Sequence, residues 1–129
     1  MSGNLNKRFG WLWIVIAPLM GMYITFQFQN VQGYGDSFIR TGNRLFHAHA
    51  GILAIFNILY GYAIDEVKAA ENSKKLGSYL AIAGTILVSL SFFALLVNAL
   101  GPIGSPSRIL GFISILVSVL ILISAQMKK

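Results

Sequence analysis

Four long apolar stretches, separated by short polar segments, make up most of the 129 residues. They cover residues 9–28, 45–64, 79–100 and 109–127. An α-helix needs about 20 apolar residues to cross about 30 Å of hydrocarbon, because each residue adds about 1.5 Å along its axis. The pattern therefore predicts an all-α membrane protein. We expect residues 1–129 to form a single integral membrane domain, an up-and-down bundle of four transmembrane helices.

Composition supports a membrane location. Hydrophobic residues account for 56% of the chain and charged residues for 11%, and the mean hydropathy is +0.70. A soluble domain of this length needs more polar surface. The net charge of +6 does not indicate nucleic acid here, because basic residues of membrane proteins serve topology and lipid headgroups. The chain has no cysteine, which excludes disulfides, thiolate metal sites and thiol nucleophiles.

The basic residues are distributed unequally between the two predicted sides of the membrane. Seven lie in the terminal and middle polar segments and three in the other two loops. Short cytoplasmic segments are enriched in Lys and Arg, so we expect a multi-pass cell-membrane protein with both termini cytoplasmic. The first stretch ends in "FQFQN" without a small-x-small cleavage pattern, so we expect a retained helix rather than a signal peptide.

The polar segments between the stretches differ in character. "QGYGDSFIRTGN" and "GPIGSPSR" are rich in Gly, Pro and Ser and are predicted to be tight turns on the outer side. The middle segment, "DEVKAAENSKK", is predicted to be a charged cytoplasmic connector that could extend either neighbouring helix by a turn.

Most strong hydrogen-bonding side chains of the four stretches fall near the predicted outer side. Polar groups at membrane depth are costly unless they are paired, so these side chains should turn inward and meet. We therefore predict one polar pocket near the outer surface, built from Gln27, Asn98, Arg44 and Arg108 with the two histidines, His47 and His49.

The two histidines should point to opposite helix faces, because two residues on an α-helix are turned by about 200° relative to each other. The face of His47 carries small residues, including Ala50, Gly51 and Ala54, which permit close approach of another helix. His47 is thus the better candidate for an interhelical contact, with Gln27 or Asn98. His49 lies on a bulkier face and would meet a gap, lipid headgroups or a partner.

Three roles remain open for these histidines. They could simply hydrogen-bond neighbouring groups, bind haem or a metal ion such as copper, or form a proton or anion site with Arg44 or Arg108. Divergent rings argue against bis-histidine haem ligation within one chain, whereas one axial ligand per chain is feasible. A copper or zinc site would need help from Asp36.

The segment "FIRTGNRLFHAHAGILAIFNILYGY", residues 38–62, resembles small prokaryotic four-helix membrane proteins that carry a GHAHAG motif at the start of the second helix. In this chain Leu45 and Phe46 separate the arginine from His47, so the usual Gly-His junction is absent. The His-x-His pair is more remotely similar to haem-ligating helices of haem–copper oxidase relatives and nitric-oxide-response membrane proteins. This resemblance implies that His47 or His49 would be an axial haem or copper ligand.

These observations lead to three functional hypotheses. The first is a small non-catalytic subunit of a larger membrane complex of respiratory or oxidase type, whose partners are the lipid bilayer and other membrane subunits or further copies of the chain. The second is a haem- or metal-binding membrane protein that uses His47 or His49. The third is a small transporter, which would have to oligomerise. No catalytic residue is assigned.

Overall fold

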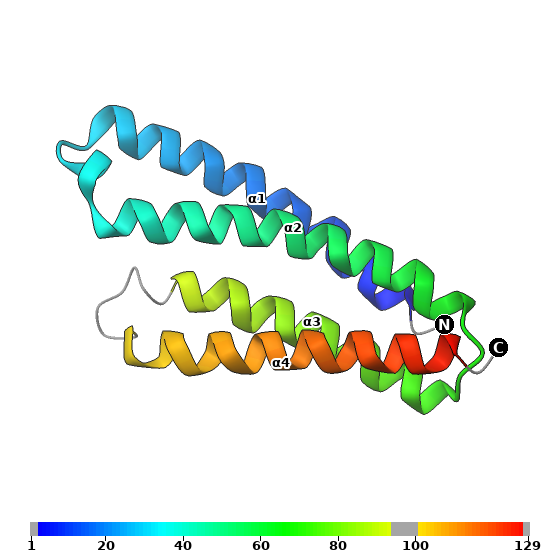
Figure 1. Cartoon of the computed structure of the whole chain (residues 1–129). Helices are drawn as coiled ribbons and strands as arrows, with labels where there is room; N and C mark the ends of the chain where they lie inside the picture. The colour runs from blue at the N-terminus through cyan, green and yellow to red at the C-terminus, as the bar shows by residue number, and fades with distance from the viewer. Residues whose placement is uncertain (1–2, 94–100, 128–129) are drawn as a thin grey trace.

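The computed structural model describes residues 3–93 and 101–127 and contains four α-helices (Figure 1). They are α1 (Gly3–Asn30), α2 (Phe38–Glu66), α3 (Glu71–Phe93) and α4 (Gly101–Gln126), with a short 3₁₀ turn, η1 (Tyr34–Asp36), between α1 and α2. No strand occurs in the described part of the chain. The predicted all-α class and the four-helix bundle are confirmed.

All four helices are long and apolar enough to cross a membrane. Their outer surfaces carry large hydrophobic side chains in contact with the surroundings, for example Leu12 and Met22, each 69% exposed. Hydrophobic exposure on this scale is rare on soluble monomers and ordinary against lipid tails. The chain is therefore a multi-pass integral membrane protein.

The helices extend beyond the apolar stretches seen in the sequence. With 28 and 29 residues, α1 and α2 are each about 43 Å long, more than the ~30 Å of hydrocarbon. Both begin in polar sequence, at Gly3 and Phe38 rather than at residues 9 and 45. Hydropathy reports only the part of a helix within the hydrocarbon, so the interfacial turns at the start of α1 and of α2 escaped prediction.

The prediction that "GPIGSPSR" forms a turn was wrong. These residues form the first two turns of α4. Pro102 lies in the first helical turn, where its missing N–H costs nothing, while Pro106 lies further inside the helix. In the same way, residues 38–43, predicted as part of the first loop, are the beginning of α2.

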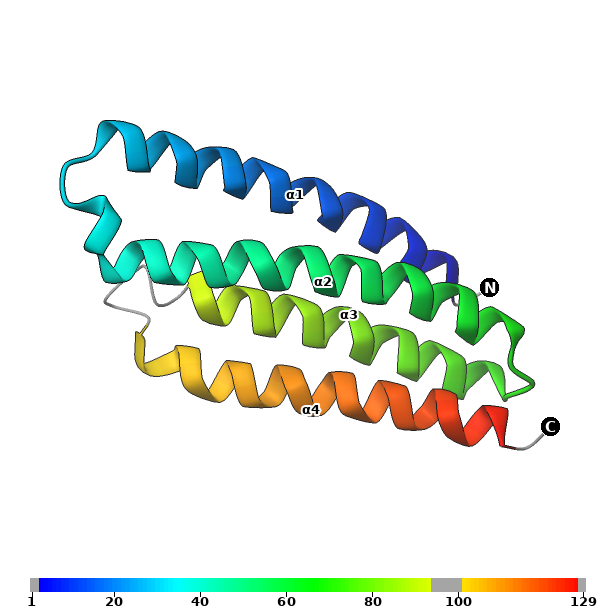
Figure 2. The same cartoon turned by 45° about the horizontal axis from the view of Figure 1, so that its top comes forward.

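The helices pack as two hairpins, α1–α2 and α3–α4, that are joined through contacts between α2 and α3. Figure 2 shows them side by side in the order of the chain. Over the described ranges, 3–93 and 101–127, α1 and α4 do not pack extensively against each other. The bundle is thus an open row with α1 and α4 at its edges, although α1 also makes a few contacts with α3.

Glycines bring the paired helices together in both hairpins. A Cβ on Gly10 of α1 would lie 2.7 Å from the backbone oxygen of Ala54 in α2, and one on Gly84 of α3 would lie 2.7 Å from that of Gly111 in α4. A side chain at these positions would collide with backbone. The small-residue face of α2 predicted to admit another helix is therefore occupied by α1 of the same chain.

Two hydrophobic clusters fill the interior along α2. One, which includes Phe46, Leu53 and Val88, lies toward the first-loop end of the bundle, where residues 31–37 connect α1 to α2. The other, which includes Tyr60 and Ile64, lies toward the opposite end, here called the Asp65 end. Asn57 of α2, fully buried, separates the two.

Candidate functional site

A buried polar network near the Asp65 end connects three helices. The Asn6 side-chain amide of α1 donates to Asn57 Oδ1 of α2 at 3.0 Å and to the Ser78 carbonyl of α3 at 3.2 Å. The Asn57 amide donates to Thr85 Oγ1 of α3 at 2.6 Å. Asn6, Asn57 and Thr85 are all 0% exposed. Each amide nitrogen is satisfied, and the network fixes how the three helices are aligned.

Sequence reasoning missed this network because Asn6 precedes the predicted helix start. Once α1 begins at Gly3, Asn6 lies on the helix and can face α2. Nearby, Lys7 Nζ forms a 2.9 Å salt bridge with Asp65 Oδ2, and the Gly3 amide donates to Asp65 Oδ1 at 3.0 Å. The polar groups of the Asp65 end are thus mostly paired within the chain.

His47 projects from α2 toward α1, where Nδ1 lies 2.6 Å from the Ala17 carbonyl oxygen. Since a carbonyl oxygen only accepts, Nδ1 carries the proton and donates in this contact. The ring fits because Gly21 has no side chain, and a Cβ there would lie 3.1 Å from His47 Cε1. Nε2 has no hydrogen-bond partner among the described residues.

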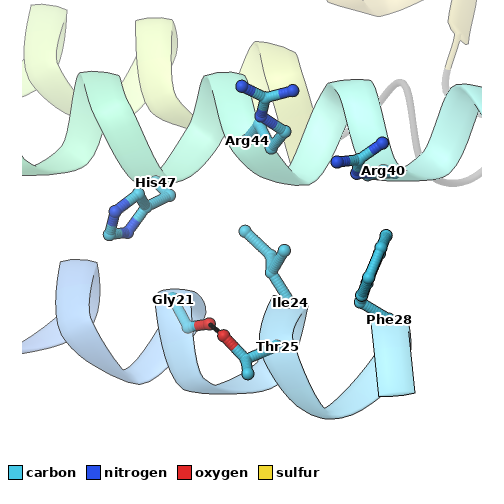
Figure 3. A pocket seen from close by; sticks show the side chains of 7 residues that line it. All are labelled: Gly21, Ile24, Thr25, Phe28, Arg40, Arg44 and His47. Atoms are coloured by element: carbon cyan, nitrogen blue, oxygen red, sulfur yellow. Dashed lines mark hydrogen bonds between the residues drawn. The ribbon is translucent and has the colours of Figure 1, made fainter. Parts of the chain in front are cut away.

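A groove of about 530 Å³ lies beside His47, between α1 and α2 at the first-loop end. Figure 3 shows Arg40 and Arg44 along α2, across from Ile24 and Phe28 of α1. Gly21, Thr25 and His47 complete the lining. Arg40, Arg44 and His47 are spaced at i, i+4 and i+7, so they share one face of α2. No described side chain lining the groove is acidic.

The two arginines differ in how they are held. Ser37 caps α2 by accepting from the Arg40 amide at 3.1 Å, and the Arg40 guanidinium donates to the Gly35 carbonyl and lies 5.1 Å from the centre of the Phe28 ring. Arg44 is exposed and makes no hydrogen bond or ion pair with the residues that the structure describes. It also lines a second groove, of about 400 Å³, on its other side.

The other predicted pocket residues are placed separately. Gln27 is half-buried on α1 but does not line the groove, and Asn98 lies outside the described residues. Arg108 of α4 donates from Nε to Ser91 Oγ at 3.3 Å and lies 4.6 Å above the centre of the Phe92 ring. The structure therefore brings His47 and Arg44 together but keeps Arg108 in a different group.

His49 belongs to that second group. Its ring lies 4.4 Å from the Phe92 ring, between centroids, and its Nδ1 contacts the Leu45 carbonyl of its own helix at 2.8 Å. His49, Phe92 and Arg108 thus form a stack across α2, α3 and α4. The two imidazoles diverge, and in the described ranges no group of three or more His, Cys, Asp or Glu residues could hold a metal ion.

Fold and site together define the class of this protein. It is a multi-pass membrane bundle of four helices, with a cationic groove between its first two helices at one end. Comparison with protein-family models, with curated proteins and with solved structures found no match.

Proposed function

We propose that the chain is a small, non-catalytic integral membrane subunit of a larger membrane complex, of the respiratory or oxidase type that its His-x-His segment suggests. The observation that carries this proposal is the open row of helices. In the most apolar windows of α1 and α4, only 11% and 17% of residues are buried, against 39% and 50% in α2 and α3. Both edges therefore offer long apolar helix faces to neighbouring helices.

Photo-crosslinking in native membranes tests this role. A photoreactive residue replacing Leu12 on α1 or Leu116 on α4, both exposed, should give a discrete product with another membrane protein. The matched control is Leu59, equally exposed but on the central helix α2, where crosslinking to protein should be weaker. A lone monomer after gentle solubilisation, without a crosslinked product at either edge, would refute the proposal. A product of two copies alone would assign a homo-oligomer instead.

We further propose that both termini are cytoplasmic and that the groove opens on the outer side. Seven of the ten basic residues lie in the segments assigned to the cytoplasm. Reporter fusions after Gln126 test this orientation. A fusion that is active only in the cytoplasm is expected, and one that is active only outside would invert the topology and place the groove in the inner leaflet.

A second function, axial haem ligation by His47, is favoured by one specific contact. Donation from Nδ1 to the Ala17 carbonyl holds the ring and leaves Nε2 as the free ligand atom, the usual arrangement of metal-binding histidines. Haem suits the site better than copper or zinc, since one protein ligand suffices. Structural zinc needs about four ligands and catalytic zinc about three.

Absorption spectroscopy of the purified protein, together with metal analysis, tests haem binding. If His47 is the ligand, His47→Ala should abolish the Soret band, while His49→Ala should leave it intact. The two variants are matched, because each histidine donates from Nδ1 to a backbone carbonyl. Absence of a Soret band and of bound iron, copper and zinc in the native protein would end this hypothesis.

A further inference from the structure

We propose that the groove between α1 and α2 binds the phosphate of an anionic phospholipid headgroup, held by Arg40 and Arg44. This site belongs to the chain itself and does not depend on the proposed complex. The inference starts from Arg44, a cation that lines two grooves and has no partner among the residues that the structure describes. A charge beside hydrocarbon is costly unless an opposite charge or water satisfies it.

The position of the arginines along α2 matches the level of lipid phosphates. The long apolar stretch of α2 begins at Leu45, directly after Arg44. Arg40 lies one turn further out, and the helix starts at Phe38. Phosphate groups lie at the same boundary, where hydrocarbon gives way to headgroups. Both guanidiniums therefore lie where a phosphate would be found.

The guanidinium of Arg40 is already held in place in the groove, and its chemistry suits a phosphate. The Gly35 carbonyl and the Phe28 ring hold the Arg40 guanidinium, so little conformational freedom remains to be lost on binding. A guanidinium is planar and pairs with phosphate oxygens through two parallel hydrogen bonds. Arg44, one turn along the same face, supplies a second cation.

The opposite wall of the groove is apolar, which favours an amphiphile over a free anion. Ile24 and Phe28 face the arginines from α1 (Figure 3). Thr25 donates its hydroxyl to the Gly21 carbonyl and offers only its oxygen as an acceptor. His47 Nδ1 already donates to the Ala17 carbonyl, so that nitrogen is not available to a phosphate. The two guanidiniums thus supply the contacts to phosphate, and the apolar wall can contact an acyl chain.

Native mass spectrometry of the full chain in a neutral detergent tests the site. Phosphatidylglycerol, phosphatidylcholine and inorganic phosphate are titrated separately. We expect phosphatidylglycerol to bind more tightly than phosphatidylcholine, and added salt to reduce that preference. Replacing both arginines (Arg40→Gln with Arg44→Gln) should weaken phosphatidylglycerol binding on the order of 10- to 30-fold, since the variant loses the charge-assisted hydrogen bonds of two guanidiniums to the phosphate.

The matched control removes two exposed basic residues away from the groove, Arg8→Gln with Lys75→Gln, with the same change in net charge. It should bind phosphatidylglycerol like the native chain. Arg44→Gln alone removes no hydrogen bond or ion pair within the described residues, so it should fold normally and show part of the loss. Equal binding of the two lipids, or an equal loss in the control, would overturn the proposal. Displacement of phosphatidylglycerol by inorganic phosphate at the same concentration would assign a free-anion site instead.

Because these measurements use the isolated chain, they separate this inference from the proposed function. If the native chain shows no preference for phosphatidylglycerol but the photoreactive residues on α1 and α4 still crosslink to another membrane protein, only the lipid site is overturned. A haem ligand at His47 is also distinguishable, because bound haem gives a Soret band and bound phosphatidylglycerol does not.

Discussion

The two ends of the α1–α2 hairpin differ in how many of their polar side chains are paired within the chain. At the Asp65 end the helices approach so closely that Gly10 and Gly61 leave no room for a side chain, and Asn6, Asn57 and Asp65 find partners inside the chain. At the first-loop end the helices enclose a groove, and Arg44 is one of its lining residues and has no hydrogen bond or ion pair with the described residues. One end is closed by internal contacts and the other is open.

This difference distinguishes polar groups that stabilise the fold from polar groups that can bind a ligand. Buried groups that are hydrogen-bonded within the chain specify helix alignment, and they offer little to a ligand because their donors are already used. A cation such as Arg44, which lies beside an apolar wall and has no partner among the described residues, has free donors, and the membrane offers it an anion. The amides and the carboxylate that are paired within the chain therefore lie at the Asp65 end, while Arg44, which is available for binding, lies at the first-loop end.

The largest expected effect concerns the close approach of α1 and α2. Gly10→Ala should destabilise the bundle by about 1–3 kcal/mol, because its Cβ would meet backbone that cannot move away. Gly51→Ala is the matched control on the same seam, since its Cβ would lie 3.6 Å from Ala17 Cβ, an ordinary contact. Unfolding in mixed detergent micelles measures both. Equal stabilities would mean that the Asp65 end is not closed.

A smaller effect is expected from the buried network. Asn57→Ala removes its bonds to Asn6 and Thr85 and should cost about 1–2 kcal/mol, the range for interhelical polar contacts in membranes. Ser124→Ala, which removes only a bond of an exposed side chain to its own helix, should be neutral in the same unfolding assay. If the combined variant with Asn6→Ala loses the full sum of the single losses, the two side chains do not interact.

The least effect is expected at the Lys7–Asp65 pair. Both side chains are partly exposed, so Lys7→Met should cost about 0.2–1 kcal/mol and the loss should shrink at high salt. Lys75→Met, at an exposed position, serves as the control for the general loss of one charge. A loss that does not change between low and high salt would show that packing of the lysine stem, rather than its charge, stabilises this end.

The hydrophobic pattern was sufficient for the number, class and membrane location of the helices, because an apolar run of about 20 residues leaves few alternatives. It could not locate the helix ends, which lie in polar sequence, and so it left Asn6 outside α1. The partner of His47 was equally hidden, since Ala17 contributes a backbone carbonyl that no side-chain pattern reveals. Arg40 lay in a segment predicted as a loop. It became a groove residue once α2 began at Phe38.

Cysteine accessibility tests the contrast between the two ends most directly, because the chain has no cysteine of its own. Thr25 and Thr85 form a matched pair, each donating its hydroxyl to the carbonyl four residues earlier, at 3.0 and 2.9 Å. Thr25 lines the groove, whereas Thr85 is fully buried in the network. Single variants Thr25→Cys and Thr85→Cys are treated with a water-soluble maleimide in a neutral detergent without added phospholipid. We expect rapid labelling of Thr25→Cys and no labelling of Thr85→Cys. Equal labelling of the two variants, or faster labelling of Thr85→Cys, would contradict an open groove at one end and a closed network at the other.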